Sequence, residues 1–237
     1  MSKRNTTNRE TRILDAAASL IAHYGYDKTT ISEIAREAGV AKGAIYLHWP
    51  TKEELFDALI TREIQRVMHA LLVQVENDPQ GGSLPRMYRH ALLSMQSNPL
   101  ICALYTQDSR VLGNYIHQQN ASRYVERFWF GKSFVEYMQA SGLIRKEIDP
   151  QGLAYVLSII AYGFTSIETI IPVHQAPPLE TIADTLDTLM MHGIAVQNND
   201  TQPGKQALRT IVSQINQQYQ AANTARINKD AEQGEPK

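Results

Sequence analysis

Between residues 30 and 52 stand several side chains of the kinds that bind phosphate oxygens, among them Thr30, Lys42, Tyr46, His48 and Lys52. Cations, hydroxyl groups and the first backbone N–H groups of a helix all donate hydrogen bonds to phosphate. Taken singly, each residue also has an ordinary structural role, the lysines as solvated charges and the tyrosine as a half-buried aromatic. Only their arrangement along the chain favours the phosphate interpretation.

The segment from Ile31 to Trp49, ISEIAREAGVAKGAIYLHW, predicts two short helices joined by a tight turn. Thr30 and Glu33 form a capping box at the start of the first helix. Gly39 stands where the turn requires a positive φ angle, and the small Ala35 lets the two helices approach closely. This spacing is typical of a helix-turn-helix, whose second helix fits the major groove of DNA.

The amino terminus adds positive charge to a chain of 237 residues whose formal net charge is -1. One glutamate opposes a local basic cluster made of Lys3, Arg4, Arg9 and Arg12. Such a cluster suits contacts to a groove or to the backbone of DNA. A plain polar tail is an equally good interpretation. In either case we expect a flexible arm over residues 1–10.

Helical periodicity continues through almost the whole chain, and glycine and proline fall between the periodic segments. We expect helices at about 11–24, 31–38, 42–49, 52–76, 84–96, 100–106, 121–140, 150–171, 179–196 and 205–222. No segment alternates polar and apolar residues with a period of two, so the predicted fold class is all-α. The polar segment 223–237 predicts a disordered tail.

Several classes of protein are disfavoured by what the sequence lacks. The single cysteine, Cys102, permits no intramolecular disulfide and fits a reducing cytoplasm. There is no glycine-rich phosphate loop, no His-Glu-x-x-His and no cysteine pair, so we expect no enzyme activity, no cofactor and no metal site. No apolar segment has the length of a membrane span or the pattern of a signal peptide.

Residues 11–59 resemble the DNA-binding domain of the TetR family. Several separate elements match in order and spacing: Ala16-Ala17, Tyr24-Gly25-Tyr26, Thr29-Thr30, Ile34-Ala35, Ala38-Gly39-Val40, Lys42-Gly43, Ile45-Tyr46, His48 and Lys52-Glu53-Glu54-Leu55. The resemblance implies a helix-turn-helix domain over residues 11–60. It also implies an all-α regulatory, ligand-binding and dimerisation domain over residues 61–222, joined to the first domain through a long helix.

The resemblance also implies a role for each residue of the DNA-binding set. Lys42, Gly43 and Ala44 are expected to face base edges, and Ser32 is expected to reach a base from the preceding helix. The residues expected to contact phosphates are Thr30, Tyr46, His48 and Lys52, with Tyr46 also near a thymine methyl group. Ala41 belongs to the same surface but departs from the serine or threonine common there, so a helix cap and a phosphate contact are expected to be missing.

For the rest of the chain the resemblance implies a homodimer that reads a near-palindromic operator in double-stranded DNA. The segments 150–171 and 179–196 are apolar on more than one face and are expected to form the dimer interface. A largely apolar small-molecule effector is expected among the middle helices. The candidate lining residues, each of which also fits an ordinary core, are Met87, Tyr88, Met95, Tyr124, Phe128, Trp129 and Tyr137.

These expectations combine into a transcriptional regulator, a repressor that its effector releases from the operator. Activation is an alternative that depends on where the operator lies. A second alternative is an all-α module that binds a small molecule or a protein and does not bind DNA. The missing cap at Ala41 is the one sequence feature that supports this second alternative.

Overall fold

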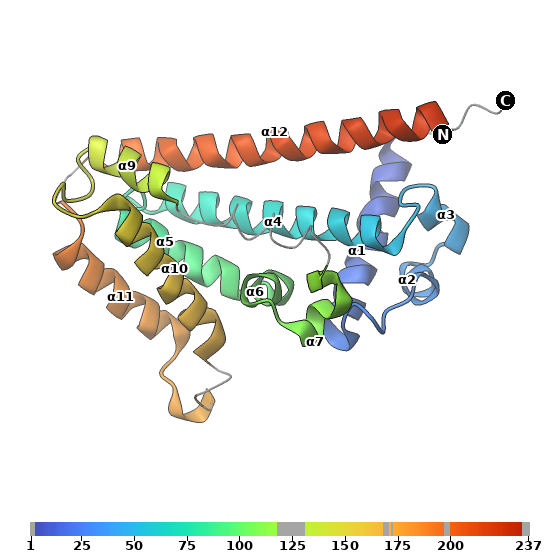
Figure 1. The fold of residues 1–237 in the computed structure, drawn as a ribbon, viewed down its shortest axis with the longest axis horizontal. Helices are drawn as coiled ribbons and strands as arrows, with labels where there is room; N and C mark the ends of the chain where they lie inside the picture. Colours follow the sequence, from blue (N-terminus) through green and yellow to red (C-terminus); the bar gives the residue numbers. More distant parts are fainter. Residues whose placement is uncertain (1–2, 118–130, 168–170, 172, 197–199, 234–237) are drawn as a thin grey trace.

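The computed structural model describes residues 3–117, 131–167, 171, 173–196 and 200–233. Figure 1 shows two groups of helices, a small one at the amino-terminal end and a larger bundle beside it. The long helix α4, Lys52–Asn77, belongs to both groups. Within the described ranges there is no strand, apart from an isolated bridge between Ile144 and Ala195. The all-α prediction is confirmed.

The small group consists of α1 (Lys3–Tyr24), α2 (Ile31–Ala38), α3 (Lys42–Tyr46) and the first turns of α4. These helices share one apolar core, whose buried members include Ile13, Ala17, Ile21, Ile34, Ala35, Ile45, Leu55, Phe56 and Leu59. A helix as short as α3 is unstable in isolation, so this core holds it in place.

The turn between α2 and α3 forms as the local sequence predicts. Thr30 and Glu33 make the capping box at the start of α2, with both reciprocal hydrogen bonds present. Gly39 ends α2 with φ +63°, in the left-handed region where a side chain is strained. The angle between α2 and α3 is therefore set by residues that are local in sequence.

Two helix boundaries in this group differ from the prediction. The helix α3 ends at Tyr46 and not at Trp49, because Pro50 disfavours helical geometry in the residue before it. The helix α1 begins at Lys3, so the residues assigned to a flexible arm are helical from that point on. No glycine or proline interrupts residues 3–10, and the hydrophobic pattern marks only the part of α1 that packs on the core.

The larger group consists of α5 (Leu84–Gln96), α6 (Pro99–Thr106), α9 (Lys132–Ala140), α10 (Pro150–Ser166) and α11 (Leu179–Gly193). The helices α5 and α6 pack on α4, α10 and α11 pack on α5, and α9 packs on α10. The side chains of Asn98 and Asp149 cap α6 and α10, each followed by a proline at the first helical position. None of the described helices has the length and hydropathy of a membrane span.

Other boundaries differ modestly from the sequence prediction. The helices predicted to end at residues 171 and 196 end at Ser166 and Gly193. Part of the predicted segment 121–140 lies outside the described residues, and α9 accounts for its end. Among the described residues, three short elements were not predicted: α7 (Ser109–Leu112), η1 (Gly113–His117) and η3 (Val173–Gln175).

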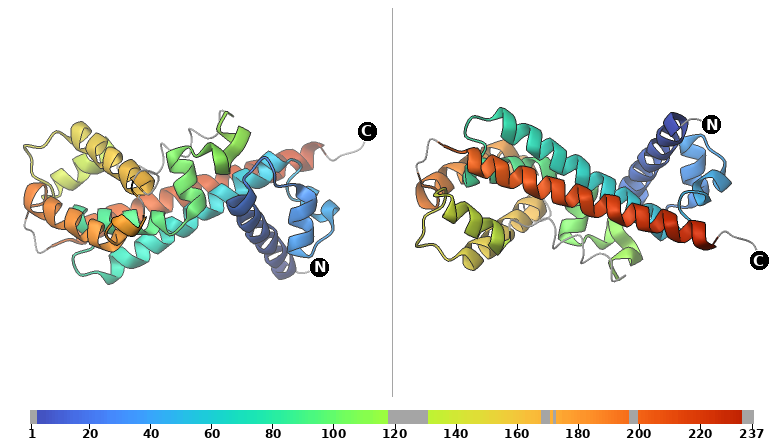
Figure 2. Two further views of the ribbon diagram at one scale, coloured as in Figure 1. Left: turned by 90° about the horizontal axis from the view of Figure 1, so that it is seen from below. Right: turned by 90° about the horizontal axis from the view of Figure 1, so that it is seen from above.

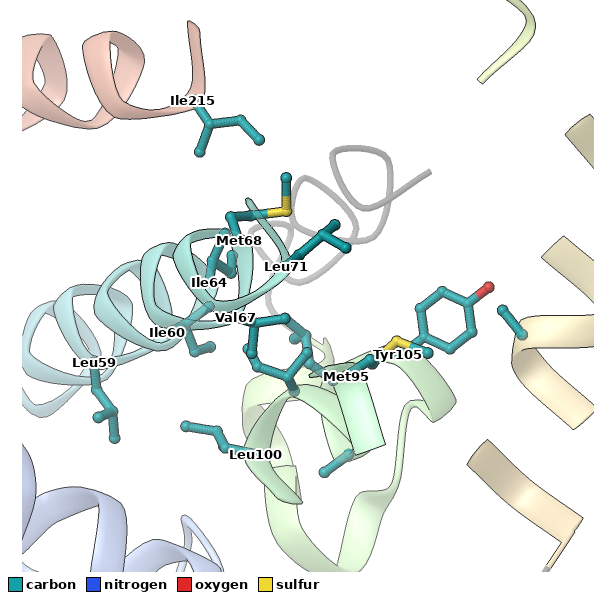
Figure 3. Packing of buried hydrophobic residues seen from close by; sticks show 14 of the residues in the cluster. Leu59, Ile60, Ile64, Val67, Met68, Leu71, Met95, Leu100, Tyr105 and Ile215 are labelled. Carbon is teal, nitrogen blue, oxygen red and sulfur yellow. The ribbon is translucent and has the colours of Figure 1, made fainter. Parts of the chain in front are cut away.

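The helix α12, Gln202–Gln233, runs beside α4 in the opposite direction and reaches the level of the amino-terminal helices (Figures 1 and 2). It is much longer than the predicted 205–222, and most of the segment predicted as a disordered tail is helical. Figure 3 shows Met68 of α4 pointing toward Ile215 of α12. Tyr105 and Met95 lie on the other side of α4.

The start of α12 is anchored to the end of α4. The buried ammonium group of Lys205 donates to the carbonyl oxygens of Glu76 and Asp78, at 3.0 and 2.7 Å. Beside it, a Cβ atom at Gly204 would overlap the carbonyl oxygen of Gly82. The chain segments at residues 82 and 204 therefore approach as closely as two backbones can, which only glycine permits.

Candidate nucleic-acid interface

The helix α3 has a buried face and an outward face. Ile45 is fully buried and Trp49 nearly so, and these two side chains attach α3 to the core. Lys42, Gly43 and Tyr46 are exposed on the other side. A Cβ atom built at Gly43 would meet nothing within 4 Å, so the space in front of this face is open. The outward face of α3 can therefore lie against a large partner.

Lys42 and Tyr46 form a pair one turn apart on this face. The ammonium group of Lys42 lies 5.8 Å from the centroid of the Tyr46 ring, within the range of a cation–π contact. This contact limits the positions that the lysine side chain samples, and it leaves the hydroxyl group of Tyr46 unused by α3 itself. The pair presents a cation and a hydroxyl donor to a ligand.

The start of α3 lacks a side-chain cap. Ala41 occupies the N-cap position with extended geometry, and its methyl group accepts no hydrogen bond. The first backbone N–H groups of a helix without a cap need other acceptors, such as water or an anion.

Thr30 and Ser32 stand at the start of α2. The hydroxyl group of Thr30 donates to Oε2 of Glu33 at 2.8 Å and accepts from the Glu33 backbone N–H at 3.3 Å. These hydrogen bonds, from the hydroxyl and the backbone of Thr30, hold the pKa of the Glu33 carboxyl below its usual value. Ser32 is exposed one residue further on. The Thr30 hydroxyl is thus already engaged, whereas Ser32 faces solvent.

His48 is oriented by α1. Its Nδ1 atom lies 3.0 Å from a carboxylate oxygen of Glu10. A ring nitrogen that donates to a carboxylate carries a proton, so this contact favours either the tautomer protonated at Nδ1 or the charged ring protonated at both nitrogens. This contact holds the ring, which follows the end of α3, against α1.

Lys52 is the least available of the predicted residues. Its ammonium group donates to the carbonyl oxygen of Tyr26 at 2.5 Å and lies 4.1 Å from the centroid of the Tyr26 ring. Burial lowers the pKa of Lys52, against the opposing effect of carboxylates that include Asp27. Lys52 therefore joins the start of α4 to the corner between α1 and α2, a packing role that the sequence alone did not reveal.

A cavity of about 70 Å³ lies inside the larger group. Its walls come from five helices and are formed by Val67, Met68, Leu71, Tyr88, Ala91, Leu92, Met95, Tyr105, Ala154, Leu157, Ser158, Ala161, Leu208 and Ile211. Among the described residues, no charged side chain lines it. A volume this small is well below the several hundred Å³ typical of ligand sites.

The predicted ligand residues divide into three sets. Tyr88 and Met95 line the cavity. Met87 is buried away from it, and Tyr137 is half-exposed on α9 and does not line it either. The predicted residues that lie outside the described part of the chain are Tyr124, Phe128 and Trp129.

The hydroxyl groups among the lining side chains are those of Ser158, Tyr88 and Tyr105. The hydroxyl of Tyr88 donates to the carbonyl oxygen of Leu157, and that of Tyr105 donates to the carbonyl oxygen of Ser158 at 3.1 Å. Burial raises the pKa of both phenols, that of Tyr105 to about 12. Both phenols are therefore neutral donors at physiological pH. Their hydrogen bonds join α5 and α6 to α10 at the wall of the cavity.

The two groups of helices meet through polar contacts near the middle of α4. Glu63, nearly buried, accepts from Arg62 at 2.7 Å and from the Asn98 side chain at 2.7 Å. Arg62 also bonds Asp15 of α1 at 2.8 Å. Asn98 is the residue that caps α6, so this cluster connects α1, α4 and α6. The signal in the sequence that could have revealed this cluster is Glu63, an acidic residue at a position of α4 where the helical pattern otherwise has apolar residues.

A second contact between the groups is made by η1. The backbone N–H of Asn114 donates to both carboxylate oxygens of Asp27, at 3.1 Å each. Tyr115 packs edge to face on Phe56 at 4.5 Å and against Tyr26 at 5.6 Å, and its hydroxyl donates to Asp57. The corner between α1 and α2 therefore rests on a segment that directly follows α6 and α7.

The outer face of α10 is apolar and exposed. Its large apolar side chains that are exposed are Tyr155, Val156, Ile159 and Tyr162, and Leu189 is exposed on α11. The prediction that α10 carries apolar residues on more than one face holds, since Leu153, Leu157 and Phe164 of the same helix are buried.

No cluster of three or more potential metal-ligating side chains occurs in the part of the chain that the structure describes.

The family model for bacterial regulatory proteins of the tetR family matches residues 13–59 of this chain. This range contains α2, α3 and the first turns of α4.

Curated relatives match at two scales. The HTH-type transcriptional regulator YhgD of Bacillus subtilis is 30% identical over 199 residues, which are 79% of this chain and 97% of that protein. An HTH-type transcriptional regulator of Mycobacterium bovis is 42% identical over 57 residues, 24% of this chain, and only 30% of its own length is covered. The shorter match covers less than a third of that relative. The longer match spans both groups of helices.

Solved structures share the fold. A TetR transcriptional regulator from Chloroflexus aurantiacus superposes with a TM-score of 0.61 at 23% identity, over 81% of this chain and 99% of that one. The regulator FadR from Bacillus subtilis, solved in complex with stearoyl-CoA, gives a TM-score of 0.57 at 18% identity, over 77% and 98% of the two chains. At these identities the likeness concerns the arrangement of the helices.

Proposed function

Because this chain belongs to the tetR family of bacterial regulatory proteins, we propose that it represses transcription by binding a near-palindromic operator as a homodimer. A small, largely apolar effector releases it from the DNA. The observation that carries the proposal is the outward face of α3, which presents a cation and a hydroxyl group to open space within a helix-turn-helix domain.

In the proposed complex α3 enters the major groove. Lys42, Gly43 and Ala44 face base edges, and Ser32 reaches a base from α2. The phosphate contacts are made by Thr30, Tyr46, His48 and Lys52, with Ala41 supplying only backbone. The geometry supports Lys42 and Tyr46 most directly, because Lys52 has to give up its Tyr26 partner before its ammonium group can meet a phosphate.

The exposed apolar face of α10, with Leu189 of α11, supports the homodimer, since an apolar surface of this kind is stable when a partner covers it. A two-fold axis through this face gives two copies of α3 and hence an operator with two related halves. Replacing Ile159 with glutamate is expected to yield monomers in sedimentation and to weaken operator binding. A dimer that persists in this variant would place the interface elsewhere.

The cavity supports the effector. It is apolar, and α4, which lines it, carries the DNA-binding helices at its other end. With about 70 Å³ the cavity is too small for a ligand of ordinary size, which therefore has to widen it. Widening displaces α4 relative to α6 and η1, which contact the DNA-binding domain through the Asn98–Glu63 and Asn114–Asp27 hydrogen bonds. A displacement of α4 turns the DNA-binding domain and so changes the distance between the two α3 helices of the dimer. A ligand that favours the widened state therefore lowers operator affinity by the coupling free energy.

The test is selection of bound fragments from random and genomic DNA, followed by affinity measurements over a salt series. We expect one near-palindromic sequence, an affinity that falls steeply with salt, and at least a tenfold loss in Lys42→Ala. Lys146→Ala, an exposed lysine between α9 and α10, is the matched control and keeps full affinity. If no DNA is enriched, or if both variants bind alike, the chain acts without DNA contact through α3.

A further inference from the structure

Leu47 follows α3 and is the most exposed large apolar side chain in the described part of the chain, at 83%. Single exposed leucines are common on protein surfaces and need no special explanation. The position of Leu47 on the outward face of α3 distinguishes it from a scattered surface leucine.

The backbone places Leu47 on the same face as the proposed base-reading residues. Its φ and ψ angles are −68° and −23°, and its N–H donates to the carbonyl oxygen of Gly43 at 3.2 Å. Leu47 therefore continues the helical path and lies one turn beyond Gly43. It is two residues from both Ile45 and Trp49, whose side chains are buried, so it points away from the core.

The rest of this face leaves room for a contact by Leu47. Gly43 has no side chain and Ala44 has only a methyl group, so neither reaches far from the helix. The ring of Tyr46 is partly occupied by the ammonium group of Lys42. Leu47 is thus the one aliphatic side chain of any length on the outward face between residues 42 and 47, all of which the structure describes.

The major groove of DNA offers one apolar group at the base edges, the C5 methyl group of thymine. We propose that Leu47 is a specificity-determining residue that contacts the methyl group of one thymine in each operator half-site. The inference rests on the proposed function, because it needs α3 in the groove. It assigns to Leu47 a contact that the resemblance gave to Tyr46.

The experiment uses the full chain and the operator obtained by selection. Each thymine is replaced in turn by deoxyuridine, which removes the methyl group and keeps every hydrogen-bonding group of the base. We expect the affinity of the wild type to fall about fourfold when one half-site is substituted, which is the effect of losing one buried methyl group. When both half-sites are substituted, two methyl groups are lost and the expected fall is about 16-fold. Other thymines in the groove are expected to show little change.

Leu47→Ala is expected to bind the thymine operator more weakly by a similar factor, and to bind the deoxyuridine operator no more weakly than the thymine operator. Leu47→Met, which keeps a long apolar side chain, is expected to retain methyl dependence. Val73→Ala, an exposed aliphatic residue on α4 away from this domain, is the matched control and changes neither affinity. Circular dichroism melts establish that all variants fold.

The outcomes separate the inference from the function it rests on. If the wild type binds its operator and no thymine responds to loss of the methyl group, Leu47 has no such contact. If Leu47→Ala responds to deoxyuridine as strongly as the wild type, another residue reads the methyl group and the proposal is overturned. If the wild type selects no DNA at all, the proposed function fails first.

Discussion

The residues proposed to contact DNA lie between positions 30 and 52, on two short helices, a turn and the start of α4. The residues that line the cavity come from five helices and extend from Val67 to Ile211. Most of the first set is exposed, and all of the second is buried or half-buried. Substitutions in the first set are therefore free to change binding while stability stays the same, whereas substitutions in the second change both.

Stability and DNA binding are expected to change together where a buried residue supports the exposed surface. Ile45 is fully buried beneath α3, and Ile45→Ala is expected to reduce the free energy of unfolding by about 3 kcal/mol. Operator affinity falls with it, because α3 loses its attachment. Urea denaturation and operator titration measure the two effects. Gly43→Ala, on the exposed face with open space before it, is the control and lowers affinity without lowering stability.

Met95→Ala tests the cavity in the same way. Shortening a lining side chain is expected to cost about 2 kcal/mol of stability, somewhat less than at Ile45 because Met95 already borders empty space. It also enlarges the cavity, so binding of an apolar fluorescent probe such as N-phenyl-1-naphthylamine should increase. Met138→Ala, buried in α9 and not lining the cavity, should lose stability without gaining probe binding. Equal probe binding by both variants would contradict the assignment.

Glu63→Gln weakens the contact between the two regions. The carboxylate is nearly buried and faces Arg62 and Arg66, but the half-exposed Arg66 is screened by solvent. We expect a loss of about 2 kcal/mol and partial separation of the unfolding transitions of the two regions in calorimetry. Glu37→Gln, exposed on α2, is the control. A single transition at the wild-type temperature would show that the regions are held together by apolar packing alone.

The smallest effect is expected for Arg209→Ala, since the ion pair with Glu76 is largely exposed. Arg209 holds the pKa of the Glu76 carboxyl below its usual value of 4.5. The pair therefore contributes stability above that pH and loses it as pH falls through the lowered pKa. Melting temperatures of variant and wild type should differ slightly at pH 7 and converge in acid. A difference independent of pH would assign the effect to packing of the arginine stem.

The recognition surface could be predicted from sequence because its determinants are local. The capping box at Thr30 and Glu33 and the turn at Gly39 are set within a few residues, and all form as predicted. Lys52 shows the limit of this reasoning, since its partner, the Tyr26 carbonyl, is 26 positions away. Sequence spacing places Lys52 on the correct helix but does not reveal that its ammonium group is already bonded.

The cavity could be predicted only in part. Periodicity shows that Met87, Tyr88 and Met95 lie on an apolar helix, but it does not tell which side of that helix meets a void. The missing information is long-range, because the walls depend on how α5 packs against α4, α6 and α10. The length of α12 was missed for a related reason: its distal residues are polar, so no apolar stripe marks residues 223–233 as part of a helix, although Gly234 directly follows its last residue.

The anchoring of α12 has a consequence for the order of synthesis and folding. The last carbonyl groups of α4 are bonded by Lys205, a residue translated 129 positions after Glu76. During translation the helix-turn-helix and its supports, up to η1, emerge well before that lysine does. We therefore expect the recognition domain to fold while the ribosome still holds the later helices. Closure of the cavity, by contrast, waits for the slow formation of contacts between distant segments.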